Sequence, residues 1–396
     1  MDIPVELQAF VLTKLDGASL ARAKRVCSLW KEAVSKLEVY GNIWMGCCLK
    51  EMAPEILCQL SGIHDLWEVT KVLDQRLSEM ARTLPWTFWR DLYAKFYRTT
   101  YIKSCCSWQF KPLVLAPPNN QVATCLKLWG NMLLLGYKNG YVSVCEDVEK
   151  AVPEFSPLHH HGRQVTGLAL VTASHKDGGP VLVSVSGGHD IQVTGLDRDT
   201  QCQLNYHSKA VYCASSWKDS FVTGAGDSIL HGQPVWRIEA PMSVQRHIVV
   251  HEHLSERPPV QPMWANQVAS GDDKGNVLLW NLHYPDEPTH LGCFNSKIRW
   301  IELRGKLLLW LTASGILYIS TNCKSYRKLD VFGSIHRKPE TMALRGPVFA
   351  VGTIAGFVHL YHVSSLRDWE ELELGQADSV IKFDAEHVNA LDHRGE

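Results

Sequence analysis

The histidines are the residues of this sequence whose type and spacing come closest to a metal site. His159, His160 and His161 are consecutive, and His251 and His253 form a second group. A zinc site needs three or four convergent ligands, which are usually oriented by further hydrogen bonds. Because no other part of the sequence supplies the remaining ligands, we interpret these histidines as polar loop residues and predict no metal or other cofactor.

No other group of residues forms a catalytic motif. Residues 272–276, Asp-Asp-Lys-Gly-Asn, resemble a calcium loop but lack the acidic ligand that should follow, so we expect a hairpin turn. The sequence has no glycine-rich phosphate loop, no Gly-x-Ser-x-Gly and no His-Glu-x-x-His. Cys27 lies in an apolar helical stripe, which is a poor setting for a reactive thiol. We therefore predict that the protein is not an enzyme.

The balance of charge points away from nucleic acid and from membrane surfaces. The 396 residues contain 40 Lys and Arg against 41 Asp and Glu. A nucleic-acid-binding domain would show a basic excess, and a membrane-surface protein would show a polybasic run. No apolar run reaches the 18 or so residues that a membrane span needs.

The cysteines indicate a reducing compartment. The sequence has 12 of them but no Cys-x-x-Cys pair, and the doublets at 47–48 and 105–106 do not fit a zinc knuckle. Asp2 and Glu6 stand where a secretory signal would be basic. We therefore expect reduced thiols and a cytoplasmic or nuclear location.

The first 50 residues must form short helices that share apolar positions. Leu7, Phe10, Val11 and Leu15 fall on one helical face. Asp16 and Gly17 should end that helix, and Ser19 is expected to cap the next one. A further stripe follows at Leu20, Ala23, Cys27, Trp30 and Val34. A bundle of this size buries only a small core, so a partner that covers its remaining apolar surface would stabilise it.

This stretch resembles an F-box, through residues that stand in the order and spacing of that motif: Pro4, Glu6, Leu7, Leu12, Leu15, Asp16, Leu20, Val26, Cys27, Trp30, Ile43 and Trp44. The resemblance implies that residues 1–50 bind a Skp-family adaptor and, through it, the cullin and RING protein of an SCF-type ubiquitin ligase. The adaptor-binding residues that it implies are Pro4, Leu7, Leu12, Leu15, Leu20, Val26, Cys27, Trp30 and Trp44. The alternative is a helical cap with an ordinary hydrophobic core.

Residues 51–118 are predicted to form a helical connector and an entry strand. Leu66, Val69, Leu73, Leu77 and Met80 recur at helical spacing. After Pro85 a second stripe contains Trp89, Leu92, Tyr93 and Phe96, which we expect to pack into a core. Residues 102–115 then become extended. The connector should hold the N-terminal helices at a fixed distance from the rest of the chain.

Residues 119–396 repeat about every forty residues, with two strands and an intervening tight turn in each unit. The residues that open the second strand of each unit are Gly140, Asp190, Asp227, Gly275, Gly315, Gly356 and Gly395. This pattern predicts a β-propeller with six complete blades and a partial seventh. The fold class is therefore α plus all-β. Residues 107–115 could supply an outer strand that closes the ring, and the last blade is otherwise incomplete or C-terminally shortened.

The units resemble WD repeats, although most of the signature is missing. Only Trp280-Asn281 approaches the Trp-Asp ending, and His161-Gly162 is the nearest match to the Gly-His opening. The resemblance to the F-box/WD-repeat family implies a substrate receptor whose propeller binds a protein target. Related receptors hold phosphorylated segments on one face of the ring, so the resemblance includes a phosphorylated target among those implied.

The target-binding residues implied by this resemblance are Lys138, Tyr212 and Arg299 on that face, with Arg163, Lys209 and Lys297 near its rim. Solvated rim charge is the alternative for all of them. Trp217, Trp264, Trp300 and Trp310 are expected to belong to the blade cores. The rival functions are a propeller scaffold outside ubiquitination and a propeller hydrolase, which would need convergent carboxylates or histidines in the channel.

Overall fold

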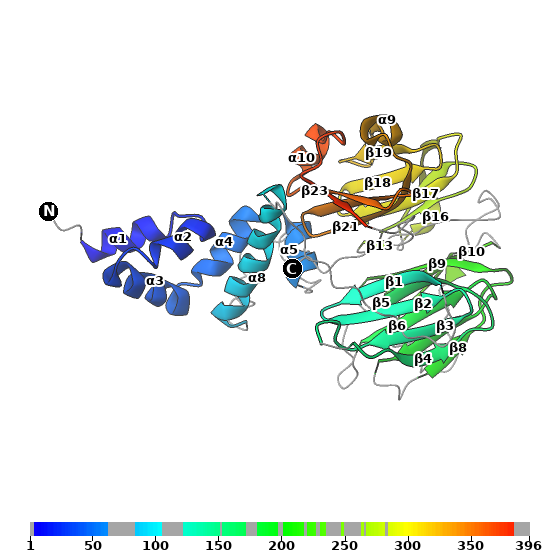
Figure 1. Cartoon of the computed structure of the whole chain (residues 1–396), viewed down its shortest axis with the longest axis horizontal. Helices are drawn as coiled ribbons and strands as arrows, with labels where there is room; N and C mark the ends of the chain where they lie inside the picture. The colour runs from blue at the N-terminus through cyan, green and yellow to red at the C-terminus, as the bar shows by residue number, and fades with distance from the viewer. Residues whose placement is uncertain are drawn as a thin grey trace.

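The computed structural model describes residues 4–61, 84–104, 122–150, 153–171, 180–196, 201–217, 220–226, 230–234, 247–248, 263–264, 267–281 and 284–383. They form an elongated helical arm and a β-propeller at one end of it (Figure 1). The predicted connector stripe at residues 66–80, the entry strand at 107–115 and the start of a seventh blade lie outside the described residues. No helix in the described ranges is long and apolar enough to cross a bilayer.

The arm is built from short helices. They are α1 (Val5–Leu12), α2 (Gly17–Ala23), α3 (Ser28–Tyr40), α4 (Ile43–Glu51), α5 (Pro54–Ser61) and α8 (Trp86–Thr99), followed by the 3₁₀ turn η1 (Thr100–Ser104). Asp16, and not Ser19, caps α2, because its Oδ1 accepts a hydrogen bond from the Ser19 backbone N–H at 2.7 Å. Cys27 plays the same part for α3, where its Sγ accepts from the Trp30 N–H at 3.5 Å.

Apolar side chains from all these helices form one core along the arm. Leu12, Leu20 and Trp89 are completely buried, and Trp44 is 4% exposed. The predicted second stripe of the connector is confirmed, since Trp89, Leu92, Tyr93 and Phe96 lie on the buried face of α8. Burial raises the pKa of the Cys48 thiol beside Trp89, as expected for a cysteine that acts as a small apolar residue.

Two carboxylates, one buried and one partly buried, tie the helices together. Glu38 is 3% exposed and accepts hydrogen bonds from Lys24 Nζ at 2.6 Å and from Trp44 Nε1 at 3.2 Å. Glu51 accepts from the backbone N–H of Gly17 at 2.9 Å and from the Tyr93 hydroxyl at 2.6 Å. Glu38 joins consecutive helices and Glu51 joins helices that are far apart in the sequence, so the arm is held by polar contacts as well as by its core.

The propeller contains six four-stranded antiparallel sheets within the described residues. The first two are β1 (Ala123–Trp129), β2 (Met132–Tyr137), β3 (Tyr141–Cys145), β4 (Ser156–His160), and β5 (Val165–Val171), β6 (Val181–Ser186), β7 (Ile191–Gly195), β8 (Gln201–Leu204). The next two are β9 (Val211–Trp217), β10 (Ser220–Ala225), β11 (Leu230–Pro234), β12 (His247–Ile248), and β13 (Met263–Trp264), β14 (Gln267–Gly271), β15 (Asn276–Asn281), β16 (Tyr284–Cys293). The last two are β17 (Ile298–Arg304), β18 (Leu307–Thr312), β19 (Ile316–Ser320), β20 (Arg327–Asp330), and β21 (Pro339–Arg345), β22 (Val348–Thr353), β23 (Phe357–His362), β24 (Ser379–Lys382). Short helices α9 (Val331–Ile335) and α10 (Leu366–Glu371) decorate the last two sheets.

The first strand of each sheet lies on the inside and contacts its counterparts in the neighbouring sheets. Thr124 on β1 shows how, because its Oγ1 donates to the carbonyl of Val165 on β5 at 2.6 Å. Thr166 repeats the contact, donating to the carbonyl of Val211 on β9 at 2.6 Å. Arg345 at the end of β21 donates to the Leu128 carbonyl on β1 at 3.1 Å, which links the last sheet to the first. The predicted propeller is thus observed.

The first six predicted turn markers fall between the second and third strands of the six sheets, although Asp227 lies outside the described residues. The turn at 272–276 is a hairpin turn, as predicted, because Asp272 accepts from the N–H and the side-chain amide of Asn276, both at 2.7 Å. Trp310 is completely buried, and Trp300 is partly buried against the core of the last two sheets. The side chains of Trp217 and Trp264 lie outside the described set.

Gly140 allows the first of these turns to pack against the next sheet. Its φ is +95°, and an added Cβ would lie 2.1 Å from the carbonyl oxygen of His161. We expect Gly140→Ala to lower the free energy of unfolding by about 2–4 kcal/mol, from the left-handed backbone and the backbone clash. Gly130 is the matched control, since its φ is +55° and a Cβ there would meet nothing within 4 Å. Thermal unfolding by calorimetry should separate the two variants, and equal losses would contradict this explanation.

The arm joins the propeller at the turns between the first and second strands of the last two sheets. Gln59 on α5 accepts a hydrogen bond from the Gly346 N–H at 2.8 Å, and Arg304 Nη1 donates to the Gly346 carbonyl at 2.5 Å. Thr99 at the end of α8 hydrogen-bonds to His362 at 3.2 Å. Arg304 is 3% exposed, and burial lowers its pKa to about 10. These contacts fix the arm to one end of the ring.

Candidate functional site

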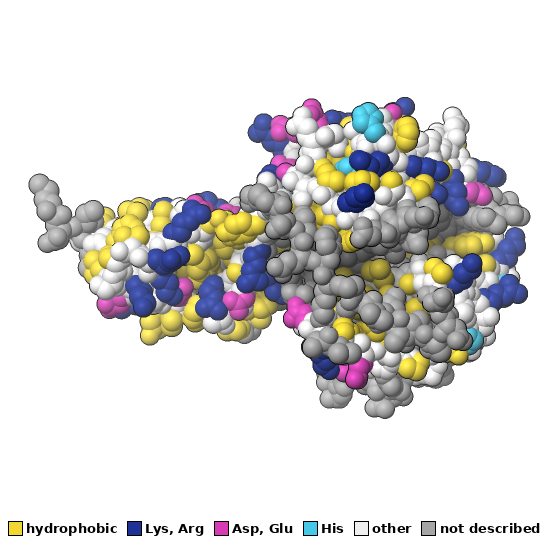
Figure 2. Space-filling model, viewed as in Figure 1, with side chains coloured by type: hydrophobic (Ala, Val, Ile, Leu, Met, Phe, Trp, Pro, Cys, Tyr) yellow, Lys and Arg dark blue, Asp and Glu magenta, His cyan; other side chains and the backbone are white. Residues whose placement is uncertain are grey.

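The arm carries an unusual concentration of exposed apolar side chains at the end remote from the propeller. Leu7, Phe10 and Val11 on α1 are 55%, 60% and 52% exposed. Val26, before α3, and Leu29, within it, are 65% and 45% exposed. We call these five residues the apolar arm surface, and Figure 2 shows apolar side chains gathered at this end of the molecule. Such a surface on a small helical unit is typical of a protein interface.

The residues that the F-box resemblance implied as adaptor contacts fall into two groups. Pro4, Leu7, Val26 and Cys27 are exposed, and Leu15 and Trp30 are partly buried. Leu12, Leu20 and Trp44 are buried at 0%, 0% and 4% exposure. These three apolar side chains fill the core of the arm and hold the exposed residues in place, and adaptor contact by the implied residues stays a prediction.

Sequence reasoning also missed three members of the apolar arm surface. Phe10 and Val11 carried a signal, because their spacing placed them on the same helical face as Leu7. Leu29 carried none, since its exposure depends on α3 starting directly after the Cys27 cap. A hydrogen bond of 3.1 Å from Trp30 Nε1 to Gln8 Oε1 fixes α3 against α1, so both halves of the surface keep one orientation.

The propeller presents its other end to solvent. We call this the distal end: it is formed by the turns between the second and third strands of each sheet, whereas the arm contacts the turns between the first and second strands. Successive turns of an antiparallel sheet lie at opposite ends of its strands. In Figure 1 the strands run away from α5 and α8, so the distal end lies opposite the arm.

The residues implied to bind a target all fall at the distal end. Lys138 lies in the β2–β3 turn, and its backbone N–H donates to the Val122 carbonyl at 3.0 Å. Arg163, Lys209 and Lys297 directly precede the inner strands β5, β9 and β17, and all three are exposed. Tyr212 is the second residue of β9 and is partly buried. These residues come from four of the six described sheets, so they lie around the mouth of the ring.

Arg299 differs from the others because it already has a partner. Its Nη1 lies 3.2 Å from Glu340 Oε2, and both side chains are about 30% exposed. The ion pair connects β17 to β21 across neighbouring sheets. A pair with this exposure contributes little to stability, but an anionic ligand would have to displace Glu340 to use Arg299.

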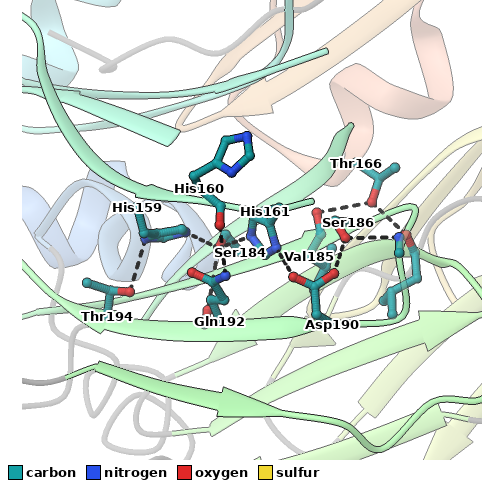
Figure 3. Close-up of polar contacts among 12 residues, drawn as sticks. His159, His160, His161, Thr166, Ser184, Val185, Ser186, Asp190, Gln192 and Thr194 are labelled. Atoms are coloured by element: carbon teal, nitrogen blue, oxygen red, sulfur yellow. Dashed lines mark hydrogen bonds and ion pairs between the residues drawn. The ribbon is translucent and has the colours of Figure 1, made fainter. Parts of the chain in front are cut away.

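The three consecutive histidines, which end β4 of the first sheet and begin the loop after it, form hydrogen bonds to residues of the second sheet (Figure 3). His161 is completely buried; its Nδ1 pairs with Asp190, and its Nε2 lies 2.8 Å from Ser184 Oγ. His159 Nε2 contacts the same hydroxyl at 2.6 Å, and its Nδ1 contacts Thr194 Oγ1 at 3.1 Å. In the described residues no three His, Cys, Asp or Glu side chains converge as metal ligands. The pair His251 and His253 lies outside them.

The network holds the β6–β7 turn against the loop that enters the sheet. Burial raises the pKa of Asp190, but hydrogen bonds from His161 and Ser186 outweigh it and lower the pKa to about 2. Asp190 therefore remains ionised and anchors His161 over the physiological range. The third sheet repeats part of the pattern, since His207 Nε2 lies 3.0 Å from Thr223 Oγ1. In the fourth, Trp280 Nε1 donates to Ser270 Oγ at 2.8 Å.

His159 makes a testable contribution to acid sensitivity. Burial, with the nearby charge of His161, lowers its pKa from 6.5 to about 4. Between these two pH values the unfolded chain binds a proton that the folded chain excludes, so stability is complete above about pH 6.5 and falls towards pH 4. We expect His159→Asn to remove up to about 3 kcal/mol of this pH dependence. His160→Asn, at the exposed neighbour, should leave the pH dependence intact. Urea unfolding of both variants across this pH range is the measurement. If the unfolding free energy changes equally with pH in the two variants, His159 is not the source of the dependence.

A profile of the F-box domain family matches residues 1–41. The chain carries an F-box at its N-terminus. The match ends between α3 and α4, so it contains the whole apolar arm surface and the Asp16 and Cys27 caps. The F-box is followed by the propeller, which the profile does not cover.

Two further comparisons add little. The solved structures similar to this chain include a computationally designed protein, Ika8, with 16% sequence identity and a TM-score of 0.49 over 65% of this chain and 74% of that one. This similarity is too low to add to the fold that the strand pairing itself defines. No curated protein matches the chain.

Proposed function

We propose that this protein is a substrate-recognition subunit of an SCF-type ubiquitin ligase. The F-box binds a Skp-family adaptor and, through it, a cullin and a RING protein, and the propeller binds the protein target. The observation that carries the proposal is the apolar arm surface within the residues that match an F-box. It provides the uncovered apolar area that a partner must bury, at the end of the arm where nothing else of the described chain approaches.

The arm supports this proposal because it is rigidly attached. A substrate receptor performs no bond chemistry and acts by holding a target lysine near the ubiquitin-charged enzyme. Such proximity is effective only when the distance between adaptor and target is fixed. Hydrogen bonds from the Gly346 N–H to Gln59 and between Thr99 and His362 join the arm to the propeller, and Ile102 packs on the last sheet. The adaptor and the target would thus sit at opposite ends of one body, in the cytoplasm, the nucleus or both.

We further propose that the sheets are degenerate WD repeats and that targets bind at the distal end. The bonds among His161, Asp190 and Ser184 support the first idea, because they tie a loop to a turn within one blade. The exposed cations Lys138, Arg163 and Lys209, with Tyr212 beside them, support the second. A phosphorylated target segment would recruit Arg299 only after Glu340 moves aside. The ring would also have one incomplete or shared blade formed with residues outside the described set.

The scaffold alternative makes a different prediction about the fate of bound proteins. Proteins captured by the propeller should be degraded faster in cells that contain the wild-type chain than in cells with a chain whose F-box cannot bind the adaptor. We expect the half-lives of these proteins to lengthen severalfold in the second case, while their binding to the propeller persists. Unchanged half-lives with unchanged binding would instead favour a scaffold.

A further inference from the structure

The last sheet carries a group of cations at the distal end that have no acidic partner. The ring of Phe357, the first residue of β23, lies between them: the Arg337 guanidinium is 3.8 Å and Lys382 Nζ is 5.8 Å from its centroid. No described acidic side chain pairs with either cation, and the nearby Glu340 is taken by Arg299. Lys338, beside Arg337, is also exposed. Among the described residues, positive charge is therefore concentrated here without an acidic partner.

Behind the ring, one nitrogen of a buried histidine also lacks a hydrogen-bond partner among the described residues. His359 is 5% exposed, and within the described chain its Nε2 makes no hydrogen bond. Its side chain shares a face of the sheet with Phe357, two residues before it, and with Val380, its cross-strand partner. Burial and the charge of Arg337 lower its pKa, so the ring is neutral near pH 7. Buried polar atoms are rarely left unpaired, which suggests that something else approaches this place.

The same face offers apolar contact beside the charge. Val380 on the outer strand β24 is 49% exposed, and Phe357 is partly buried. Cross-strand pairing places Lys382 next to Phe357 and Val380 next to His359. Figure 2 shows Lys and Arg side chains around apolar ones over this part of the propeller. The surface therefore suits an anionic group with an apolar neighbour.

We propose that Arg337, Lys382, Phe357 and Val380 form a subsite for a segment of the target protein in which an Asp or Glu residue and an apolar residue stand two positions apart. The subsite rests on the proposed function of the propeller and specifies the chemistry of its target. A guanidinium stacked on an aromatic ring keeps its N–H donors available in the plane that matches a carboxylate. Phosphate recognition typically uses clusters of arginines, whereas one arginine and one lysine here flank the ring. Residues two apart on an extended segment lie on one face, so an acidic and an apolar side chain with this spacing would both face the subsite.

The test measures fluorescence anisotropy of labelled peptides with the purified full-length chain. The probe is a pool of peptides in which Glu and Leu or Val stand two positions apart, and two further pools replace Glu with Gln or with phosphoserine. We expect the Glu pool to bind, and Arg337→Gln with Lys382→Gln to weaken its binding at least tenfold. Val380→Asp should weaken it independently through repulsion. Arg367→Gln, on α10 at the other end of the same sheet, is the control and should change nothing.

Three outcomes would overturn the subsite. They are equal binding of the Glu and Gln pools, unchanged binding of the Glu pool by the double variant, and preferred binding of the phosphoserine pool through the same two residues. Melting curves of every variant exclude misfolding as the cause. Adaptor binding measured on the same preparations keeps the two proposals apart, because a chain that binds the adaptor but not the Glu pool overturns the subsite alone.

Discussion

A chain with Leu7→Asp and Val26→Asp is expected to lose at least a hundredfold in affinity for a Skp-family adaptor while its melting temperature stays unchanged. The two side chains are 55% and 65% exposed, so charge there does not disturb the core of the arm. At an interface the same charges would be buried against apolar groups without a partner. Residues at the centre of an interface cost 2 kcal/mol or more when they are lost, and two such losses exceed a hundredfold.

The matched control is Val39→Asp with Tyr40→Asp. These residues are 51% and 87% exposed and belong to the same helical arm, at the end of α3 away from the apolar arm surface. Surface plasmon resonance with immobilised adaptor would measure all three chains. If both double variants lose affinity equally, the interface is not confined to the apolar arm surface. If neither does, the surface does not bind the adaptor.

The second large effect is expected in the core of the arm, at Trp89. This side chain is completely buried between α4 and α8, where Cys48 Sγ contacts its backbone carbonyl at 3.4 Å. Trp89→Ala would leave a cavity in a small core and should lower the stability of the arm by about 3–5 kcal/mol. Hydrogen exchange is the suitable measurement, because the two parts of the chain need not unfold together. Protection of α4 and α8 amides should fall by about a hundredfold to a thousandfold, and amides of the propeller should keep theirs.

Trp86→Ala is the control for this substitution. Trp86 starts the same helix but is only partly buried, with Arg90 5.1 Å from its ring. Its loss should cost much less. A second variant, Trp89→Phe, should retain most of the stability, because Trp89 Nε1 makes no hydrogen bond among the described residues. Equal losses at positions 86 and 89 would show that the core does not centre on Trp89.

The propeller was predictable because its signals are local. An apolar strand, a small turn residue and a second strand lie within one stretch of sequence, and Gly140 or Gly275 marks the turn through its left-handed backbone. The helical stripe of α8 was predictable for the same reason, since helical spacing places Trp89 and Tyr93 on one face.

The division of the F-box residues into core and surface could not be predicted. Leu7 and Leu12 look alike in sequence, yet one is 55% exposed and the other is fully buried, because burial depends on how α1 packs against α3. The helix caps depend on backbone geometry that residue types alone do not define, so Ser19 was expected where Asp16 acts. The Arg299–Glu340 pair joins segments that only the folded ring brings together. The burial of His359, whose Nε2 makes no hydrogen bond within the described residues, depends on the same packing.

The central claim is that the N-terminal arm binds a Skp-family adaptor. Isothermal titration calorimetry of the full-length chain with the purified adaptor tests it most directly. We expect one adaptor to bind per chain, with a dissociation constant below about 1 μM and a negative heat-capacity change from the burial of apolar surface. A folded chain that releases or takes up no heat at several temperatures, and does not co-elute with the adaptor, would contradict membership of the ligase.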